Sequence, residues 1–266
     1  MSYRLPIHQR LSNALSYGEF RIYYQPIVKM HDSSIIGMEA LCRWPQRDDT
    51  FVPPDTFIQQ AETSGFIIQL GEWVLRTSTD QVKRWQREFS RDLRLAVNLS
   101  GRQFLHFGLL KQVEEALRSS GFNPRDLEIE ITETVAMHNA EESIGVMRQL
   151  KALGISLSLD DFGTGYSSLS YLKRFPMDIL KIDKSFVRDI PEDANDLAIV
   201  SAIIAMAHAL GLHVLAEGVE TVAQRDFLRD CGVDYAQGYY FSRPLAAPEM
   251  EELLRADSMQ QAIAAS

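Results

Sequence analysis

The chain is poor in the features that mark secreted and membrane-spanning proteins. Its 266 residues include only two cysteines, Cys42 and Cys231, which lie far apart and match no zinc-binding spacing. We therefore expect both to be reduced thiols in the cytosol. No apolar run reaches the ~18 residues of a membrane span, and the segment after Met1 lacks the regions of a secretion signal. These absences predict a cytoplasmic domain that makes no membrane contact itself, either alone or as part of a larger sensor protein.

Basic residues are also fewer than acidic residues. The chain has 27 Lys and Arg against 36 Asp and Glu, which gives a net charge of −9. A sequence-independent grip on long nucleic acid needs a basic surface, so this class of partner is excluded. A small nucleotide held through metal ions remains compatible with the charge. The rest of the composition, with 45% hydrophobic and 24% charged residues, is ordinary for a packed globular protein.

Strand and helix patterns alternate along the chain, and no linker-like stretch interrupts them. The predicted strands are 20–28, 35–44, 93–98, 127–131, 155–160, 178–183, 212–217 and 232–236. The predicted helices are 7–17, 53–61, 70–89, 107–118, 139–152, 167–173, 195–210, 220–229 and 248–255. The first two strands can pair antiparallel, and Pro26 indicates an edge or a bulge. The alternation predicts one α/β domain over residues 1–266, with an ordered core at about 5–256, folded as a closed barrel.

Polar side chains share one face of several predicted strands. They are Glu128, Glu130, Ser156, Ser158, Asp160, Lys181 and Asp183. Because alternate residues of a strand face opposite ways, one face of each strand should pack on helices and the other should line a polar lumen. The sequence offers no partner for Glu128, which sits lower on its strand than Glu130.

Other polar residues fall at strand ends, where barrel enzymes bind their ligands. The set is Glu39, Asn98, Glu130, Asp160, Asp161, Lys181, Glu217 and Gln237. Each alone has an ordinary explanation as a helix cap, a turn residue or a solvated side chain. Together, the carboxylates would repel one another unless divalent cations lay among them. Ligands that are all oxygen favour Mg²⁺ or Mn²⁺, with Ca²⁺ as an alternative, and the six histidines show no ligand spacing.

The adjacent pair Asp160-Asp161 indicates a site for two ions. One carboxylate can bridge both ions while the other serves only the second, and such sites are a recurrent device for hydrolysing phosphate esters. Lys181 would then orient the attacking hydroxide or neutralise charge on the phosphate. Glu217 and Glu220 add a base or ligand and a supporting residue.

Two short motifs overlap the aspartate pair. Asp161-Phe162-Gly163 matches the metal-binding triplet of protein kinases, but no kinase catalytic loop or glycine-rich loop precedes it. Gly163-Thr164-Gly165 can be read either as a phosphate-cradling turn or as a structural turn, and both readings stay open. Ser167-Ser168 is a plausible helix N-cap.

Eight short blocks follow one another in order over nearly the whole chain. They are Tyr24-Gln25-Pro26-Ile27, Glu39-Ala40-Leu41, Asn98-Leu99-Ser100, Glu130-Ile131-Thr132-Glu133, Asp160-Asp161-Phe162-Gly163-Thr164-Gly165, Lys181-Ile182-Asp183, Ala216-Glu217-Gly218-Val219-Glu220 and Gln237-Gly238-Tyr239. Together they resemble the EAL-domain family of cyclic-di-GMP phosphodiesterases, whose name is the motif at Glu39. The chain carries no diguanylate-cyclase signature.

The resemblance implies a modified TIM (β/α)8 barrel with one antiparallel strand, which agrees with the pairing expected for residues 20–43. The implied metal ligands are Glu39, Asn98, Glu130 and Asp160 for one ion, and Asp160 and Asp161 for the second. The two ions would be Mg²⁺ or Mn²⁺, whereas Ca²⁺ is expected to inhibit.

The resemblance also implies roles around the metal ions. Lys181 would engage the nucleophilic water, and Glu217 would be either the general base or a metal-site ligand. Glu133 would steady the loop 160–168, which in the family also lies near a dimer interface. The residues implied to contact the dinucleotide or to support the metal–water network are Gln25, Arg43, Asp183, Glu220 and Gln237.

The activity implied by the family is hydrolysis of cyclic-di-GMP to linear pGpG by metal-activated water, without a covalent intermediate, in a homodimer. Three alternatives remain: a receptor that binds cyclic-di-GMP without turnover, an enzyme for a different phosphodiester, and a scaffold with a vestigial barrel mouth. None of the family's ligands is missing from this sequence. An active enzyme is therefore the favoured interpretation.

The all-oxygen ligand set leads to a prediction about the ion. Mg²⁺ or Mn²⁺ should support hydrolysis of cyclic-di-GMP, and a chelator should abolish it. Ca²⁺ should occupy the site but support little turnover, because its looser geometry and longer bonds misplace the water. Product assays on demetallated protein, with each ion added back separately, check this. Full activity of the demetallated protein would rule out metal catalysis.

Overall fold

The computed structural model describes residues 7–46, 50–163 and 169–264, and its strands close into a barrel. The barrel strands, in order around the barrel, are β1 (Arg21–Lys29), β2 (Ile35–Pro45), β4 (Arg94–Asn98), β5 (Leu127–Thr132), β6 (Ser156–Phe162), β7 (Ile179–Ile182), β8 (His213–Ala216) and β9 (Tyr235–Ala236). Closure comes from β1, which pairs with β2 on one side and with β9 on the other. The two-residue strands β3 (Phe51–Val52) and β10 (Leu245–Ala246) extend the sheet beyond the barrel.

Strand β1 runs antiparallel to both of its barrel neighbours, whereas the pairs from β2 through β4 to β9 are parallel. This confirms the modified barrel with one antiparallel strand. The edge of β1 that faces away from β2 pairs with β10 at Tyr23 and Tyr24 and with β9 at Val28 and Lys29. Pro26 lies between these two stretches, where its missing N–H costs no ladder bond, and the expected bulge in the pairing with β2 follows it directly.

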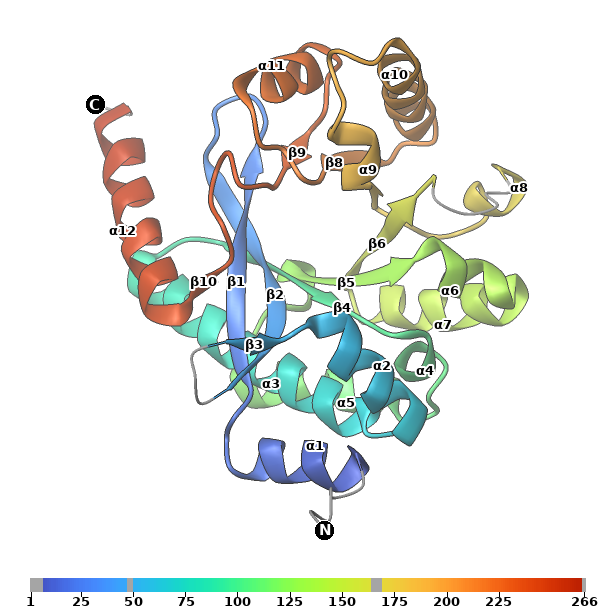
Figure 1. Cartoon of the computed structure of the whole chain (residues 1–266), viewed down its shortest axis with the longest axis vertical. Helices are drawn as coiled ribbons and strands as arrows, with labels where there is room; N and C mark the ends of the chain where they lie inside the picture. The colour runs from blue at the N-terminus through green and yellow to red at the C-terminus, as the bar shows by residue number, and fades with distance from the viewer. Residues whose placement is uncertain (1–6, 47–49, 164–168, 265–266) are drawn as a thin grey trace.

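Helices surround the strands in the order expected from the sequence. They are α1 (Ile7–Ser16), α2 (Pro54–Ser64), α3 (Ile67–Phe89), α4 (Gly101–Phe104), α5 (Leu109–Ser120), α6 (Glu133–His138), α7 (Ala140–Ala152), α8 (Leu169–Leu172), α9 (Lys184–Val187), α10 (Ala194–Ala209), α11 (Val222–Asp230) and α12 (Ala247–Ala264). Figure 1 shows α1, α2 and α3 gathered at the end near the N-terminus, with α10 and α11 at the opposite end. No helix in the described ranges is long and apolar enough to cross a membrane.

The aliphatic faces of the strands form the main core, as the alternation predicts. Leu127, Ile129 and Ile131 of β5 are fully buried in the cluster that joins barrel and helices. A second cluster lies outside the barrel, where α1 and α2 pack on Trp44 at the end of β2. Because Trp44 follows Arg43 directly, this cluster fixes the strand end that carries a predicted substrate residue.

The lumen is polar only in its upper part. Its floor is an apolar cluster of Ile27, Ala96, Ile179, Leu215 and Tyr235. Glu128 borders this floor beside a cavity of about 10 Å³, which is room for one water molecule at most. Its Oε1 has no hydrogen-bond partner in the described part of the chain, and burial raises the pKa of its carboxyl. The expectation of a polar lumen therefore holds for the mouth and fails for the floor.

Several elements differ from the sequence prediction. The short helices α4, α6 and α9 were not predicted, because a single turn shows no apolar period. The last barrel strand is shorter than the predicted 232–236, and α12 is longer than the predicted 248–255. The reading of Gly163-Thr164-Gly165 and the cap at Ser167-Ser168 fall largely on residues 164–168, which lie outside the described residues.

The contact between α3, β2 and α12 gives a stability prediction. Arg91 donates to the carboxylate of Asp257 at 2.7 Å and to the carbonyl oxygen of Ile35 at 2.6 Å, and both ionic side chains are largely buried. Arg91→Met should lower the free energy of unfolding by about 2–3 kcal/mol, because it leaves a buried carboxylate and carbonyl unpaired. Urea unfolding measures this loss.

The matched control for this prediction is Arg255, which pairs with Glu88 and Glu251 at the same α3–α12 contact but is about half exposed. Arg255→Ala should cost less than about 1 kcal/mol, since exposed ion pairs contribute little. Equal losses for the two variants would contradict the prediction.

Candidate active site

Lys181 lies at the centre of the barrel mouth. It is on β7, its side chain is 1% exposed, and its Nζ lies 2.8 Å from Glu130 Oε2, 2.7 Å from Glu217 Oε1 and 3.3 Å from Asp160 Oδ1. Burial disfavours the charged ammonium, but the surrounding carboxylates outweigh it and hold the pKa of Lys181 well above its ordinary value. The lysine is therefore a fixed positive charge shared by three strands.

Two side-chain amides extend this network across the mouth. Gln237, which follows β9, donates from Nε2 to Glu39 Oε2 at 2.8 Å and to Glu217 Oε1 at 3.0 Å. Asn98, at the end of β4, donates from Nδ2 to Glu39 Oε1 at 2.6 Å. The amides hold Glu39 and Glu217 together without adding charge. The structure thus brings all these predicted strand-end residues into one hydrogen-bonded cluster.

The cluster holds more acidic groups than one lysine balances. Burial raises the pKa of Glu217 to about 7 although Lys181 opposes it, and burial also holds the pKa of Glu130 well above its ordinary value. The pKa of Asp161 is raised by burial and by the nearby carboxylates of Asp160 and Asp183. Because like charges raise one another's pKa in this way, the mouth is a place where additional cations would be stabilised.

The donor set fits a divalent ion, although no ready-made metal cluster is present. Within the described residues, no group of three or more His, Cys, Asp or Glu side chains is already arranged to hold a metal. The ammonium of Lys181 lies among the carboxylates in this arrangement. However, Glu130 Oε1 is buried with no hydrogen-bond partner among the described residues. That orphaned oxygen and the oxygens of Glu39, Asn98 and Asp160 are the hard donors that Mg²⁺ and Mn²⁺ prefer.

A bulge at the end of β6 explains how adjacent aspartates serve one site. Successive residues of a regular strand face opposite sides, but the pairing of β6 with β7 shifts between Leu159 and Phe162. Asp161 has φ of +55°, a left-handed conformation that strains a residue with a side chain. As a result, Asp160 and Asp161 line the same cavity.

This cavity is a groove of about 410 Å³ that runs from the barrel mouth to α2 and the start of α3. Its walls include Arg43, Asn98, Asp160 and Asp161, with Asp55 on the α2 side. Arg43 is half-buried, and its Nη1 donates to the carbonyl oxygen of Cys42 at 3.0 Å. A substrate in the groove would therefore contact both the predicted metal ligands and a guanidinium.

Glu133 lies where the sequence analysis expected it. It is the first residue of α6, is 3% exposed, and accepts a hydrogen bond on Oε2 from the backbone N–H of Gly163 at 3.0 Å. This contact ties the end of β5 to the chain just after Asp161. Glu133 can therefore support Asp161 without touching a substrate.

The remaining predicted residues are less central. Gln25 faces Glu39 across β1 and β2, and its Nε2 donates to the carbonyl oxygen of Ser242 at 3.4 Å. Asp183 is the N-cap of α9, with Oδ1 accepting from a backbone N–H at 3.0 Å. Glu220 is exposed, and its backbone N–H, not its carboxylate, donates a hydrogen bond to Gln224 Oε1. The structure thus brings Gln25 to the edge of the cluster, but the carboxylates of Asp183 and Glu220 do not join its hydrogen bonds.

The sequence analysis missed two buried glutamines next to this site. Gln103 and Gln224 each form a capping box, with Ser100 and Thr221 respectively, at the first turn of α4 and α11. Both helices follow strand ends that carry site residues. The Ser/Thr-x-x-Gln spacing was the signal in the sequence that could have identified them.

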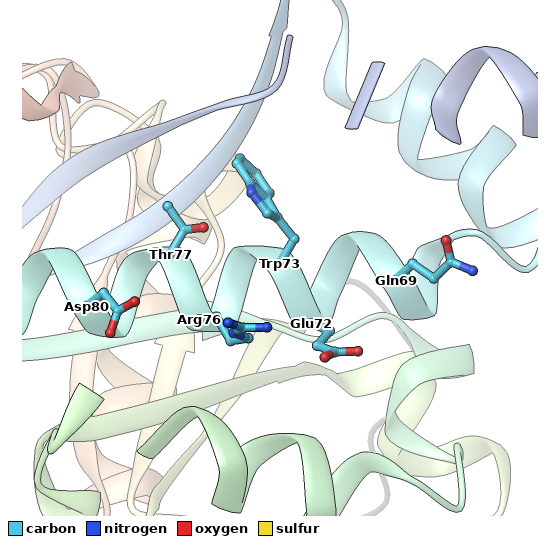
Figure 2. A pocket seen from close by; sticks show the side chains of 6 residues that line it. All are labelled: Gln69, Glu72, Trp73, Arg76, Thr77 and Asp80. Carbon is cyan, nitrogen blue, oxygen red and sulfur yellow. The ribbon is translucent and has the colours of Figure 1, made fainter. Parts of the chain in front are cut away.

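A second hollow, of about 320 Å³, lies on the outer face of α3 (Figure 2). It is lined by Gln69, Glu72, Trp73, Arg76, Thr77 and Asp80, all from this one helix. Figure 2 shows these side chains along the helix surface, with no strand-end residue among them. The mouth of the barrel is therefore the candidate active site.

The raised pKa of Glu217 predicts a pH-dependent stability of the metal-free protein. The folded state binds a proton up to about pH 7, whereas the unfolded state releases it near 4.5, so this group makes folding less favourable as the pH rises through that window. Glu217→Gln should gain stability relative to the parent protein over the same window, by up to about 3 kcal/mol. Urea unfolding in chelator at pH 5 and pH 8 measures the difference.

The exposed Glu220 provides the control, because Glu220→Gln removes a carboxylate of the same loop that water already solvates. That variant should show the same difference from the parent protein at both pH values. A pH-independent effect of Glu217→Gln would show that Glu217 is ionised throughout.

Comparisons with known proteins identify the family of the chain. Cyclic di-GMP phosphodiesterase NbdA of Pseudomonas aeruginosa is 43% identical over 252 residues, which cover 95% of this chain and 32% of that protein. The bifunctional diguanylate cyclase/cyclic di-GMP phosphodiesterase MucR of the same organism is 42% identical over 247 residues, covering 93% and 36%. The chain therefore spans about a third of the length of these curated relatives.

Solved structures give the same result. The PaMucR phosphodiesterase in complex with c-di-GMP matches with a TM-score of 0.88 and 42% identity, over 92% of this chain and 100% of that one. The FimX EAL domain from Pseudomonas aeruginosa bound to c-di-GMP matches with a TM-score of 0.81 and 26% identity, over 90% and 96%. The model of the EAL domain matches residues 8–244, and the chain belongs to the EAL-domain family.

Proposed function

We propose that this chain is a single phosphodiesterase domain that hydrolyses cyclic-di-GMP to linear pGpG. The observation that carries the proposal is the buried Lys181, which is ion-paired with Glu130, Asp160 and Glu217. Asp160 of this cluster lines a groove that also contains Arg43. Relatives named cyclic di-GMP phosphodiesterases, about 40% identical, support the same substrate. A neighbouring structure that contains c-di-GMP supports the same ligand.

Divalent ions complete the proposed site, and divalent-metal dependence is general in this family. Two ions, Mg²⁺ or Mn²⁺, would supply charge stabilisation on the phosphate and a nucleophilic water at neutral pH. The residues that would hold them are Glu39, Asn98, Glu130 and Asp160 for one, and Asp160 and Asp161 for the other. The shared cavity wall of Asp160 and Asp161 supports the bridging role of Asp160.

The chain's own residues then divide the remaining work. Lys181 Nζ is held by the carboxylates of Glu130, Asp160 and Glu217, so its fixed positive charge stabilises the attacking water and the charge that develops on the phosphate. The carboxylate of Glu217 accepts the proton of that water. The pKa of Glu217, raised by burial to about 7, suits a general base near neutral pH. Gln237 keeps Glu217 next to Glu39 through its bridging amide.

The substrate is positioned from the β1–β2 side of the groove. Arg43 offers a guanidinium to a phosphate, a geometry in which two N–H groups can bind at once. Gln25 lies beside Glu39 in the antiparallel pair, close to the same end of the groove. These residues bind and orient the dinucleotide, whereas the lysine cluster performs the chemistry.

The direct test is turnover of cyclic-di-GMP by the purified chain with Mg²⁺, with the product identified by mass spectrometry. Linear pGpG as the product supports the proposal. Tight binding without turnover would make the chain a cyclic-di-GMP receptor instead, and turnover of other phosphodiesters at equal rates would remove the substrate assignment.

The adjacent aspartates separate binding from chemistry. Asp161→Asn removes charge from one ion only, so it should bind cyclic-di-GMP within roughly tenfold of the parent protein, about 1.4 kcal/mol, yet lose nearly all turnover. Asp160→Asn should impair both ions and therefore lose metal-dependent affinity as well. Calorimetric titration in Mg²⁺ beside a product assay distinguishes the two. Normal hydrolysis by Asp161→Asn, or a milder effect of Asp160→Asn, would refute the bridging assignment.

A further inference from the structure

Gln224 is a buried glutamine whose side chain bonds only to backbone groups. It is 5% exposed and lies in the first turn of α11. Its Oε1 accepts from the N–H groups of Glu220 at 2.7 Å and Thr221 at 2.9 Å. Its Nε2 donates to the carbonyl oxygens of Val187 at 3.0 Å and Arg188 at 3.1 Å. These four contacts use all the hydrogen-bonding capacity of the amide.

The four contacts join two segments that follow neighbouring strands. Glu220 and Thr221 belong to the loop after β8, which begins with Glu217. Val187 and Arg188 end α9, the helix that begins three residues after Lys181 on β7. Gln224 therefore links the loop that carries the proposed base to the helix that follows the lysine strand.

A second contact between the same segments shows how closely they pack. Gly218 has φ of +68°, and a Cβ atom added there would lie 2.5 Å from the Cβ of Lys184 in α9. A side chain at this position would therefore push the loop away from α9. The loop approaches α9 at Gly218 and is bonded to it at Gln224, so its path between these points is defined from both ends.

The contacts of Gln224 bear on the distance between Lys181 and Glu217, because they hold the loop that begins with Glu217. Lys181 Nζ lies 2.7 Å from Glu217 Oε1. Glu217 is the first residue after β8, and its backbone N–H donates to the carbonyl oxygen of Ile182 on β7. Past that bond, the loop is held by Gln224 and by the backbone of Gln237, which accepts from Val219. Positions of reacting groups must be kept within about 0.5 Å for full activity, so a loosened loop would separate base and lysine.

A role as a helix cap alone does not account for these contacts. The cap of α11 needs only two bonds: the hydroxyl oxygen of Thr221 accepts from the N–H of Gln224 at 3.2 Å, and the N–H of Thr221 donates to Gln224 Oε1 at 2.9 Å. The two bonds to α9 add nothing to that cap. They connect the cap to the lysine side of the mouth.

We infer that Gln224 is a positioning residue for hydrolysis, which holds the Glu217 loop against α9 so that Glu217 and Lys181 stay in register. The inference rests on the proposed phosphodiesterase function for its kinetic consequence, but its structural consequence is independent of that function. Gln224 touches neither substrate nor ion, so it acts on turnover rather than on binding.

The test compares Gln224→Met with Thr221→Ala. Gln224→Met keeps the size of the side chain and removes all four bonds, whereas Thr221→Ala removes the cap hydroxyl and leaves the link to α9 in place. For Gln224→Met we expect kcat for cyclic-di-GMP to fall by at least about tenfold with KM within about twofold, as for other residues that support a metal site from outside. Thr221→Ala should retain kcat within about twofold although it melts at a lower temperature.

Amide hydrogen exchange gives the readout that does not depend on activity. In Gln224→Met the N–H groups of Glu217 and Glu220 should exchange at least about tenfold faster, while the β5 amides keep their protection and show that the barrel is folded. Thr221→Ala should leave these amides protected. Unchanged exchange in Gln224→Met, or kcat equal to that of Thr221→Ala, would overturn the inference. If Gln224→Met exchanges faster but the parent protein itself does not hydrolyse cyclic-di-GMP, only the phosphodiesterase assignment is contradicted.

Discussion

The structure depends on one buried ammonium group. Lys181 is almost completely enclosed, and its charge is tolerated only because Glu130, Asp160 and Glu217 surround it. Without any of these partners the buried ammonium would carry a desolvation cost of several kcal/mol. The three carboxylates come from β5, β6 and the residue after β8, so the lysine on β7 also ties its neighbouring strand ends together. The proposed catalytic geometry and the packing of these strand ends therefore rest on the same interaction.

The reversed first strand gives the site its asymmetry. Because β1 runs antiparallel to β2, Gln25 pairs opposite Glu39, whereas the strands from β4 to β8 contribute residues at or near their carboxyl ends. The side of the mouth next to β1 is thus built from side chains at mid-strand and from Gln237 after β9. This side holds Glu39 together with neutral amides and Arg43, whereas Glu130, Asp160 and Lys181 lie on β5, β6 and β7.

Much of this arrangement could be predicted from the sequence, because strand parity is a strict rule. The alternation in β5, β6 and β7 places Glu130, Asp160 and Lys181 on the lumen side, and the structure brings all three together. Parity fails where the backbone leaves the strand. Asp183 lies just past β7 and bonds to the first turn of α9, and Glu220 lies in a loop that turns its carboxylate to solvent. The bridge made by Gln237 could not be predicted either, since it joins residues almost two hundred positions apart.

The apolar floor of the lumen closes one end of the barrel among the described residues. Ile27, Ile179 and Leu215 close the end opposite the mouth, and the space beside Glu128 admits at most one water molecule. The carboxylates and the ammonium at the mouth are therefore shielded from water on that side. Attraction and repulsion among these charges are stronger there than between the same groups in bulk water.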